Sequence, residues 1–224
     1  MELQKKIVDD GFNLSLNQSY SEYFSEGLRF VNTHYKDDFD RIATTDFNTI
    51  TSEFFFQETA WVICASGFNA KIVSKFFPKL MEICAPLQNV INGTLNVNTI
   101  DVAMRALELF NNKNKIKAII DSAFIIGIGT NKFGWSVYKD TQLNTPDKLK
   151  ILPYIGDITK FHLARNIGLI ENVKPDLHLN RAAKHWGFDN ALELCSEIQK
   201  ENGMPLGLID LVLWYSLSSF GSKK

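Results

Sequence analysis

Hydrophobic side chains recur at helical spacing along almost the whole chain, and this periodicity constrains the fold more than any other feature. From Asn69 to Ile83 the apolar residues repeat every three or four positions, which places them on one face of an α-helix. Strand signals are nearly absent, and the short run Trp135–Tyr138 is the single candidate. The sequence therefore predicts an all-α fold of about ten helices.

Further helices are expected where apolar periodicity follows a capping residue or ends at a turn residue. They cover Ser21–Tyr35, Phe47–Ala65, a segment capped by Asn98, Ile116–Ile126, Pro146–Ile151, Asp157–Asn166, Asp176–Trp186, Asn190–Asn202 and Pro205–Ser219. Gly127 and Gly129 are expected to break the helix that begins at Ile116, because glycine weakens helix interiors. The stretch Thr130–Asn144 is then expected to be irregular.

Composition places the chain among folded soluble proteins. Its 224 residues suffice for one large domain or two small ones, and they are 45% hydrophobic and 22% charged. We expect no signal peptide and no membrane span, because the N-terminus lacks an apolar core and no apolar run is long enough. Cys64, Cys84 and Cys195 are far apart in the sequence, so we expect buried, reduced thiols in a cytoplasmic protein and no bound metal or cofactor.

The charge is nearly balanced overall but unevenly distributed. The formal net charge is −1, whereas the segment from Lys148 to Lys184 holds seven basic and three acidic residues, a balance of +4. Such an excess fits a phosphate-binding face, and it also fits chance.

That basic segment contains a turn, Leu152-Pro-Tyr-Ile-Gly-Asp-Ile-Thr-Lys160, that opens directly into a predicted helix. Pro153 fixes its own φ, and Gly156 permits the sharp reversal of the backbone. The first amides of the following helix have no intrahelical partner, so they can bind a DNA phosphate. Thr159 and Lys160 can add a hydroxyl and an ammonium group. The alternative is an ordinary turn between two helices.

A single carboxylate, Asp176, follows Ile158 by eighteen residues and begins the next predicted helix. As an N-cap it would accept backbone hydrogen bonds that favour its ionised form. An ionised carboxylate can activate water or stabilise the positive sugar that forms when an N-glycosidic bond breaks. The alternative role of Asp176 is capping alone.

In this order and spacing, the turn and the carboxylate resemble the helix-hairpin-helix DNA glycosylase superfamily, which includes endonuclease III and the adenine and alkyl-base glycosylases. The family pattern is Leu-Pro-Gly-x-Gly-x-Lys/x-Thr-Ala, with an aspartate eighteen residues after the variable lysine. The matching positions are Leu152, Pro153, Gly156, Thr159 and Asp176. The four clustered cysteines of the iron–sulfur members are lacking here.

The resemblance implies that Asp176 is the catalytic carboxylate of an enzyme that releases a damaged or mispaired base from double-stranded DNA. Tyr154 replaces the first glycine of the pattern, and Lys160 replaces its alanine. Ile158 stands where bifunctional members carry a Schiff-base lysine, so a monofunctional glycosylase without strand cleavage is expected. Lys174 remains an alternative amine for lyase activity.

The resemblance also implies two helical lobes. Residues 41–170 would form a barrel-like lobe ending in the hairpin, and residues 1–40 with 171–224 would form the second lobe. Asp176 would lie at the mouth of the cleft between them. The expected protein is a monomer that works on lesion-containing DNA in the cytoplasm, associated with the nucleoid and not with a membrane.

Residues expected to contact DNA fall into three groups. The first group is expected to bind the DNA and comprises Pro153, Tyr154, Gly156, Ile158, Thr159, Lys160 and His178; for His178 the alternative is an ordinary surface histidine. Candidates for a wedge that fills the space left by a flipped base are Ser66, Phe68 and Asn69, in the loop after the second expected helix. Candidates for stacking on that base are Trp61 and Trp214, with Phe55, Trp135 and Trp186 as further aromatics. For each aromatic residue, burial in a helical core is the competing interpretation.

Two other functions fit the same sequence. A non-catalytic helix-hairpin-helix module would bind DNA for a larger assembly and tolerate the loss of Asp176. An all-helical scaffold whose turn only imitates the motif would bind no DNA. The lesion is open as well: alkylated purines would suit aromatic pockets through cation–π stacking, and oxidised guanine or mispaired bases are equally compatible.

Overall fold

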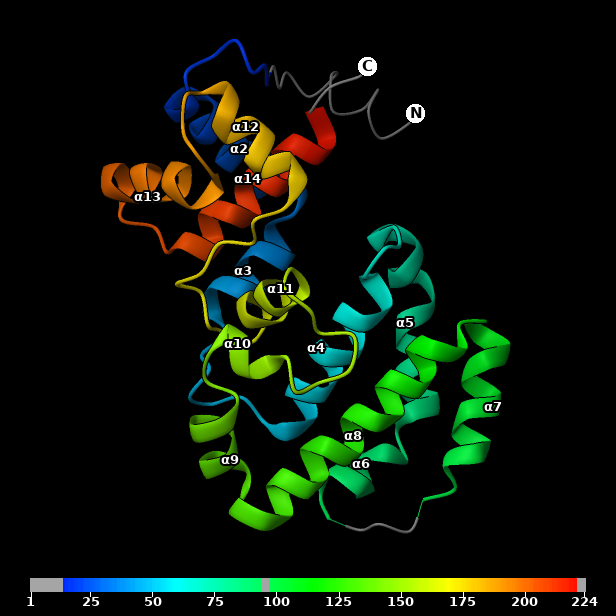
Figure 1. Ribbon diagram of the computed structural model, residues 1–224. Helices are drawn as coiled ribbons and strands as arrows, with labels where there is room; N and C mark the ends of the chain where they lie inside the picture. Colours follow the sequence, from blue (N-terminus) through cyan, green and yellow to red (C-terminus); the bar gives the residue numbers. More distant parts are fainter. Residues whose placement is uncertain (1–13, 94–96, 221–224) are drawn as a thin grey trace. The chain divides into compact units, whose positions relative to one another are not determined.

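The computed structural model describes residues 14–93 and 97–220, and within these ranges the protein is all-α, with thirteen helices and no strand. The chain divides into two compact units (Figure 1). One unit is Asp46–Leu169, and the other combines Met1–Thr45 with Ile170–Lys224. The all-α prediction is confirmed. The sequence predicted lobe boundaries after residues 40 and 170. In the structure the two units divide after residues 45 and 169.

The described residues of the unit Asp46–Leu169 form eight helices. They are α4 (Ser52–Ala65), α5 (Ala70–Cys84), α6 (Leu87–Ile91), α7 (Thr99–Leu109), α8 (Lys113–Phe133), α9 (Trp135–Gln142), α10 (Pro146–Leu149) and α11 (Thr159–Asn166). The longest, α8, packs against α4, α6, α7 and α9 (Figure 1). Its inward residues, among them Ile119 and Ile126, join the core formed by Phe55, Ile63 and Leu163.

The expected break of the helix at Gly127 and Gly129 is wrong, because α8 continues through both residues. Both glycines allow a close approach by a neighbour. A Cβ atom at Gly127 would lie 2.3 Å from the carbonyl oxygen of Val90 in α6, and one at Gly129 would lie 2.3 Å from the ring of Tyr138 in α9. These positions therefore exclude larger residues for packing reasons, while the helix itself tolerates glycine.

The stretch expected to be irregular, 130–144, is helical for most of its length. Gly134 ends α8 with a φ of +77°, and α9 begins at the next residue, Trp135. The strand candidate Trp135–Tyr138 is consequently helix, because Tyr138 is buried against α8 while Trp135 packs on Phe55. Tertiary packing has overridden the β-propensity of these aromatic residues.

The other unit contains the helices α2 (Tyr20–His34), α3 (Lys36–Thr44), α12 (Leu177–His185), α13 (Ala191–Asn202) and α14 (Leu206–Phe220). The apolar helix α14 lies at its centre, in contact with the other four. It packs tightly against α2, where a Cβ atom at Gly27 would lie 2.5 Å from the hydroxyl of Ser216. This unit therefore joins segments from both ends of the described chain (Figure 1).

All three cysteines are free and buried, as expected from their spacing. Burial raises the pKa of the Cys64 and Cys84 thiols to about 12, so both remain protonated and unreactive at neutral pH. In the described part of the chain no single helix is long and apolar enough to cross a membrane, although α13 and α14, bent by 111° at their junction, pass that test as a pair.

Substitution Gly127→Ala is expected to lower the free energy of unfolding by about 1–3 kcal/mol, because the added methyl group collides with backbone atoms of α6. Urea denaturation followed by circular dichroism measures the change. Ile128→Ala is the matched control on the same helix, since Ile128 is 61% exposed, and it should stay within about 0.5 kcal/mol of wild type. Equal stability of the two variants would contradict the close-packing account.

Candidate nucleic-acid interface

A turn of nine residues, 150–158, joins α10 to α11, and the two helices pack against each other. Leu152 and Ile155 within the turn are buried in the core of the unit, as is Leu149 at the end of α10. Tyr154 and Ile158 are each 43% exposed. The turn therefore has an anchored inner side and an outer side that presents backbone and side chains to solvent.

The left-handed position of this turn is Tyr154, with a φ of +64°, the only non-glycine residue of the described chain with positive φ. An L-residue in this conformation costs about 1–2 kcal/mol. The expectation that Gly156 makes the reversal is wrong: its φ is not positive, and a Cβ atom there would meet open space. Tyr154 thus adopts the glycine conformation at the position where the glycosylase pattern has its first glycine.

Internal hydrogen bonds fix the outer side of the turn. The hydroxyl of Thr159 donates to the carbonyl of Tyr154 at 3.1 Å and accepts from the amide of Gly156 at 2.8 Å. The next three amides, those of Asp157, Ile158 and Thr159, have no hydrogen bond to any described residue. They stand at the N-terminus of α11, where unpaired N–H groups and the helix dipole favour an anion.

The charged side chains of the turn are paired with each other. Lys160, only 12% exposed, lies 2.7 Å from Asp147, and Lys150 lies 2.6 Å from Asp157. Hydrogen bonds from these lysines hold the pKa values of Asp147 and Asp157 below their usual range. The ammonium of Lys160 and the hydroxyl of Thr159 therefore have intramolecular partners, and either group must exchange its partner in order to bind a phosphate.

Asp176, in the other unit, is the N-cap of α12. One carboxylate oxygen, Oδ1, accepts hydrogen bonds from the amides of His178 at 2.9 Å and Leu179 at 3.0 Å. The second oxygen, Oδ2, lies 3.9 Å from the ammonium of Lys174. That ammonium is also 6.0 Å from the ring of Trp214. Asp176 therefore caps α12 through Oδ1, and Oδ2 accepts no hydrogen bond from a described residue.

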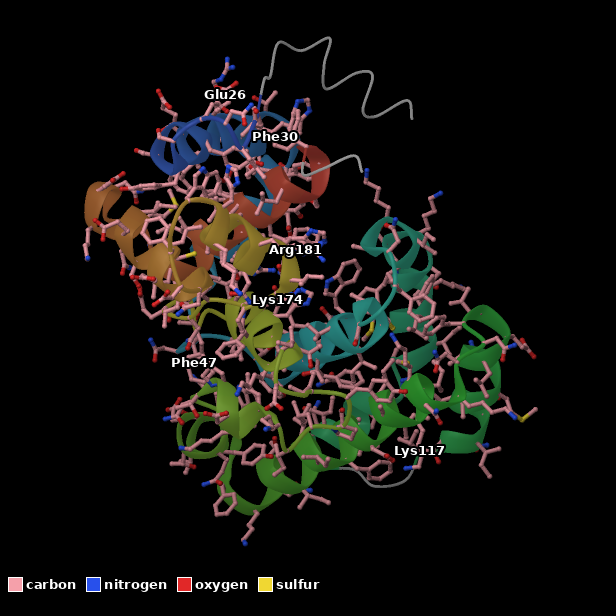
Figure 2. The ribbon with its side chains drawn as sticks, turned by 45° about the horizontal axis from the view of Figure 1, so that its top comes forward. Glu26, Phe30, Phe47, Lys117, Lys174 and Arg181 are labelled. Atoms are coloured by element: carbon pink, nitrogen blue, oxygen red, sulfur yellow. The ribbon has the colours of Figure 1, made fainter. Side chains whose placement is uncertain are left out.

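The backbone of Lys174 is fixed by a hydrogen bond, and its side chain is mostly buried. Its amide donates to the buried carboxylate of Asp210 at 3.1 Å, and its side chain is 18% exposed. Figure 2 shows Lys174 and Arg181, a residue of α12, in the same unit. The imidazole of His178, expected to contact DNA, is exposed on the first turn of this helix, next to Asp176.

The loop between α4 and α5 carries the wedge candidates, and sequence reasoning missed the residue that holds this loop. The buried ammonium of Lys115 donates to the carbonyl of Cys64 at 2.9 Å and of Ser66 at 2.5 Å. It also lies 4.4 Å from the centre of the Phe68 ring. Burial lowers its pKa. The only available signal was a lysine directly before the first apolar residue, Ile116, of a predicted helix.

The three wedge candidates occupy different positions in this loop. Ser66 is the C-cap of α4, and the side chain of Asn69 caps α5 by accepting from the amide of Lys71 at 2.9 Å. Phe68 packs edge-on against Phe110 and is still 44% exposed. Of the three, Phe68 alone combines a large apolar side chain with exposure.

Most of the aromatic pocket candidates have structural partners. The indole N–H of Trp135 donates to the carbonyl of Ile50, and that of Trp186 donates to the carbonyl of Gln18. Phe55 is fully buried. Trp61 packs edge-on against Phe77, and both Trp61 and Trp214 are partly buried. Trp61 belongs to the unit Asp46–Leu169, and Trp214 belongs to the other unit.

Within residues 14–93 and 97–220 no group of three histidine, cysteine or acidic side chains could hold a metal ion. No family model, no curated protein and no solved structure matches the chain.

The variant Tyr154→Gly should be more stable than Tyr154→Ala by about 1 kcal/mol, because glycine adopts positive φ freely and alanine does not. Both variants remove the same ring, so their difference isolates the backbone strain. Gly156→Ala should be tolerated, since its Cβ meets open space. Chemical denaturation of the three variants measures these differences, and a greater stability of the alanine variant at position 154 would refute the left-handed assignment.

Removal of the buried ammonium in Lys115→Met is expected to lower the free energy of unfolding by about 2 kcal/mol, because the carbonyls of Cys64 and Ser66 lose a charged donor. Lys75→Met, at an exposed lysine of α5, serves as the control and should have little effect. Hydrogen exchange should also become faster in the loop after α4. Unchanged exchange there would mean that Lys115 does not hold the loop.

Proposed function

We propose that this protein is a monofunctional DNA glycosylase of base-excision repair, which hydrolyses the N-glycosidic bond of a damaged or mispaired base flipped out of duplex DNA. The observation that carries the proposal is the turn between α10 and α11. A left-handed residue at the glycine position of the glycosylase pattern is followed there by three amides without partners at a helix N-terminus.

The amides of Asp157, Ile158 and Thr159 can donate hydrogen bonds to the oxygens of one phosphate of the DNA backbone. Backbone N–H groups bind phosphate independently of base sequence, as an enzyme that searches for lesions requires. The buried anchors Leu152 and Ile155 support this role, because they fix the turn before DNA arrives. Little conformational entropy is then lost on binding.

Asp176 would supply the carboxylate. In the proposed reaction, water attacks C1′ of the deoxyribose, the bond to the base nitrogen breaks, and the base leaves with that electron pair. Oδ2, which lies 3.9 Å from the ammonium of Lys174, takes the proton from water, while the two amides on Oδ1 hold the carboxylate in place. The negative charge also stabilises the cationic sugar of the transition state.

The absence of lyase activity is proposed from Ile158, whose side chain has no amine to attack C1′. Lys160 is a poor substitute because it is paired with Asp147 and is 12% exposed. Lys174 is the remaining alternative, since its ammonium lies 3.9 Å from the proposed catalytic carboxylate.

Phe68 is the favoured wedge because it is exposed, whereas Ser66 is the C-cap of α4 and Asn69 is the N-cap of α5. An apolar ring inserted between base steps replaces the stacking of the flipped base. Lys71 and Lys75 are exposed on the first turns of α5, and their charges would attract the adjacent DNA backbone.

The second candidate function is a non-catalytic DNA-binding module. One observation favours it: the unit Asp46–Leu169 carries the turn and has its own hydrophobic core, whereas Asp176 lies in the other unit as a fully formed N-cap. Such a module would bind duplex DNA through the turn and would release no base.

Asp176→Asn and Asp176→Ser are expected to reduce base release by at least about 100-fold. Both retain a side-chain oxygen that can cap α12, so their stability should remain within about 1 kcal/mol of wild type. Base release is measured on end-labelled duplexes that each carry one alkylated purine, oxidised guanine or mispaired base. Samples are compared with and without alkali, which cleaves abasic sites.

The outcomes separate the candidates. Alkali-dependent cleavage that both variants lose supports the glycosylase and names its base, whereas cleavage without alkali contradicts the monofunctional assignment and directs attention to Lys174. DNA binding without release on any lesion would favour the non-catalytic module. No DNA binding at all would refute both and leave the scaffold.

A further inference from the structure

An apolar groove runs between α7 and α8, on a part of the protein that the proposed function does not use. Its volume is about 320 Å³, and six of its nine lining residues are apolar. Ile100, Met104 and Leu107 form one wall, at the spacing of a single helical face. Ile100 is 71% and Met104 is 62% exposed. Exposed apolar side chains gathered in one place are typical of an interaction surface.

The opposite wall gives the groove a basic edge. Ile116 and Ile120 of α8 provide its apolar part, and Lys113 and Lys117, one helical turn apart, stand beside them. Figure 2 shows Lys117 on α8. Lys117 forms an ion pair with Asp121 on its own helix, whereas Lys113 has no ion pair to a described residue. An occupant should therefore be an apolar helix with acidic residues along one side.

Helix α7 itself has these properties. Beside its exposed apolar face lie Asp101 and Glu108, both exposed and seven residues apart. Arg105 is paired with Asp101 at 3.5 Å, which leaves Glu108 as the acidic group nearest the end of the helix. We propose that the groove binds α7 of a second copy of this chain, so that α7 and α8 of both copies form a symmetric homodimer.

The short connection between α7 and α8 places the acidic and the basic residues of the proposed interface at the same end of the two helices. Residues 110–112 join α7 to α8, so Glu108, Lys113 and Lys117 all lie at the same end of this helical pair. When two copies pack with parallel α7 helices about a two-fold axis, Glu108 of each copy approaches Lys113 and Lys117 of the other. Each contact therefore occurs twice, as in isologous interfaces.

The interface is small. Helix α7 has 11 residues, which corresponds to a length of about 16 Å. Contacts of this size belong to the weak end of specific protein interfaces, so the dissociation constant should be about micromolar. The dimer would replace the monomer expected from the sequence, and it is independent of the proposed glycosylase activity.

Sedimentation velocity of the full-length protein at increasing concentration tests the proposal. Wild type should shift from monomer to dimer, and Met104→Glu should weaken the association at least about ten-fold, because it buries a carboxylate in the apolar face. Ile128→Glu is the control, since Ile128 is a similarly exposed residue of α8 outside the groove. Circular dichroism establishes that each variant is folded.

A charge exchange tests the pairing of the two copies. Glu108→Lys alone and the double variant Lys113→Glu/Lys117→Glu alone should each dimerise more weakly than wild type. An equal mixture of the two should recover the dimer, because both halves of the mixed interface are again oppositely charged. A misfolded variant would not produce this recovery.

Three results would overturn the proposal. Wild type could remain monomeric at all concentrations, or the dimer could be lost in Ile128→Glu and kept in Met104→Glu. Alternatively, native mass spectrometry could find a monomer carrying a co-purified amphiphile that Met104→Glu loses, which would assign the groove to a different occupant.

Discussion

The unit that carries the turn is organised by the close packing of one long helix, α8, against its neighbours. Gly127 brings α8 within van der Waals contact of the α6 backbone, and Gly129 does the same for the ring of Tyr138. Because protein interiors are packed as densely as crystals of small molecules, an added methyl group would force the α6 backbone to shift at Gly127 and the Tyr138 ring to shift at Gly129. The positions of α4, α6, α7 and α9 all depend on this helix.

Buried lysines hold the ends of helices and loops in the same unit. Lys115 binds the carbonyls at the end of α4, and Lys139, almost fully buried, binds the carbonyls of Phe47 and Asn48 before α4 begins. Each ammonium satisfies carbonyl groups that lack intrahelical partners. The proposed wedge, Phe68, is thus presented by a loop that a buried charge holds in place.

The turn between α10 and α11 and the carboxylate of Asp176 combine structural and proposed chemical roles. Tyr154 bears the backbone strain that a glycine would avoid, and such strain is often found at functional sites. Asp176 uses one oxygen for capping and leaves the other beside Lys174. The capping role and the proposed catalytic role are compatible because they use different oxygens.

The sequence by itself determined the all-α class, most of the helices, the burial of the cysteines and the N-cap at Asp176, because each depends on local spacing or on capping chemistry. It failed at Gly127, Gly129 and the helix α9, where contacts between segments distant in the sequence outweigh local propensity. Only the tertiary structure decided that Tyr154 takes the left-handed position, that Lys115 holds the loop before Phe68, and that α7 and α8 enclose an apolar groove. These features depend on which side chains meet in space, and that cannot be deduced from the period of one helix.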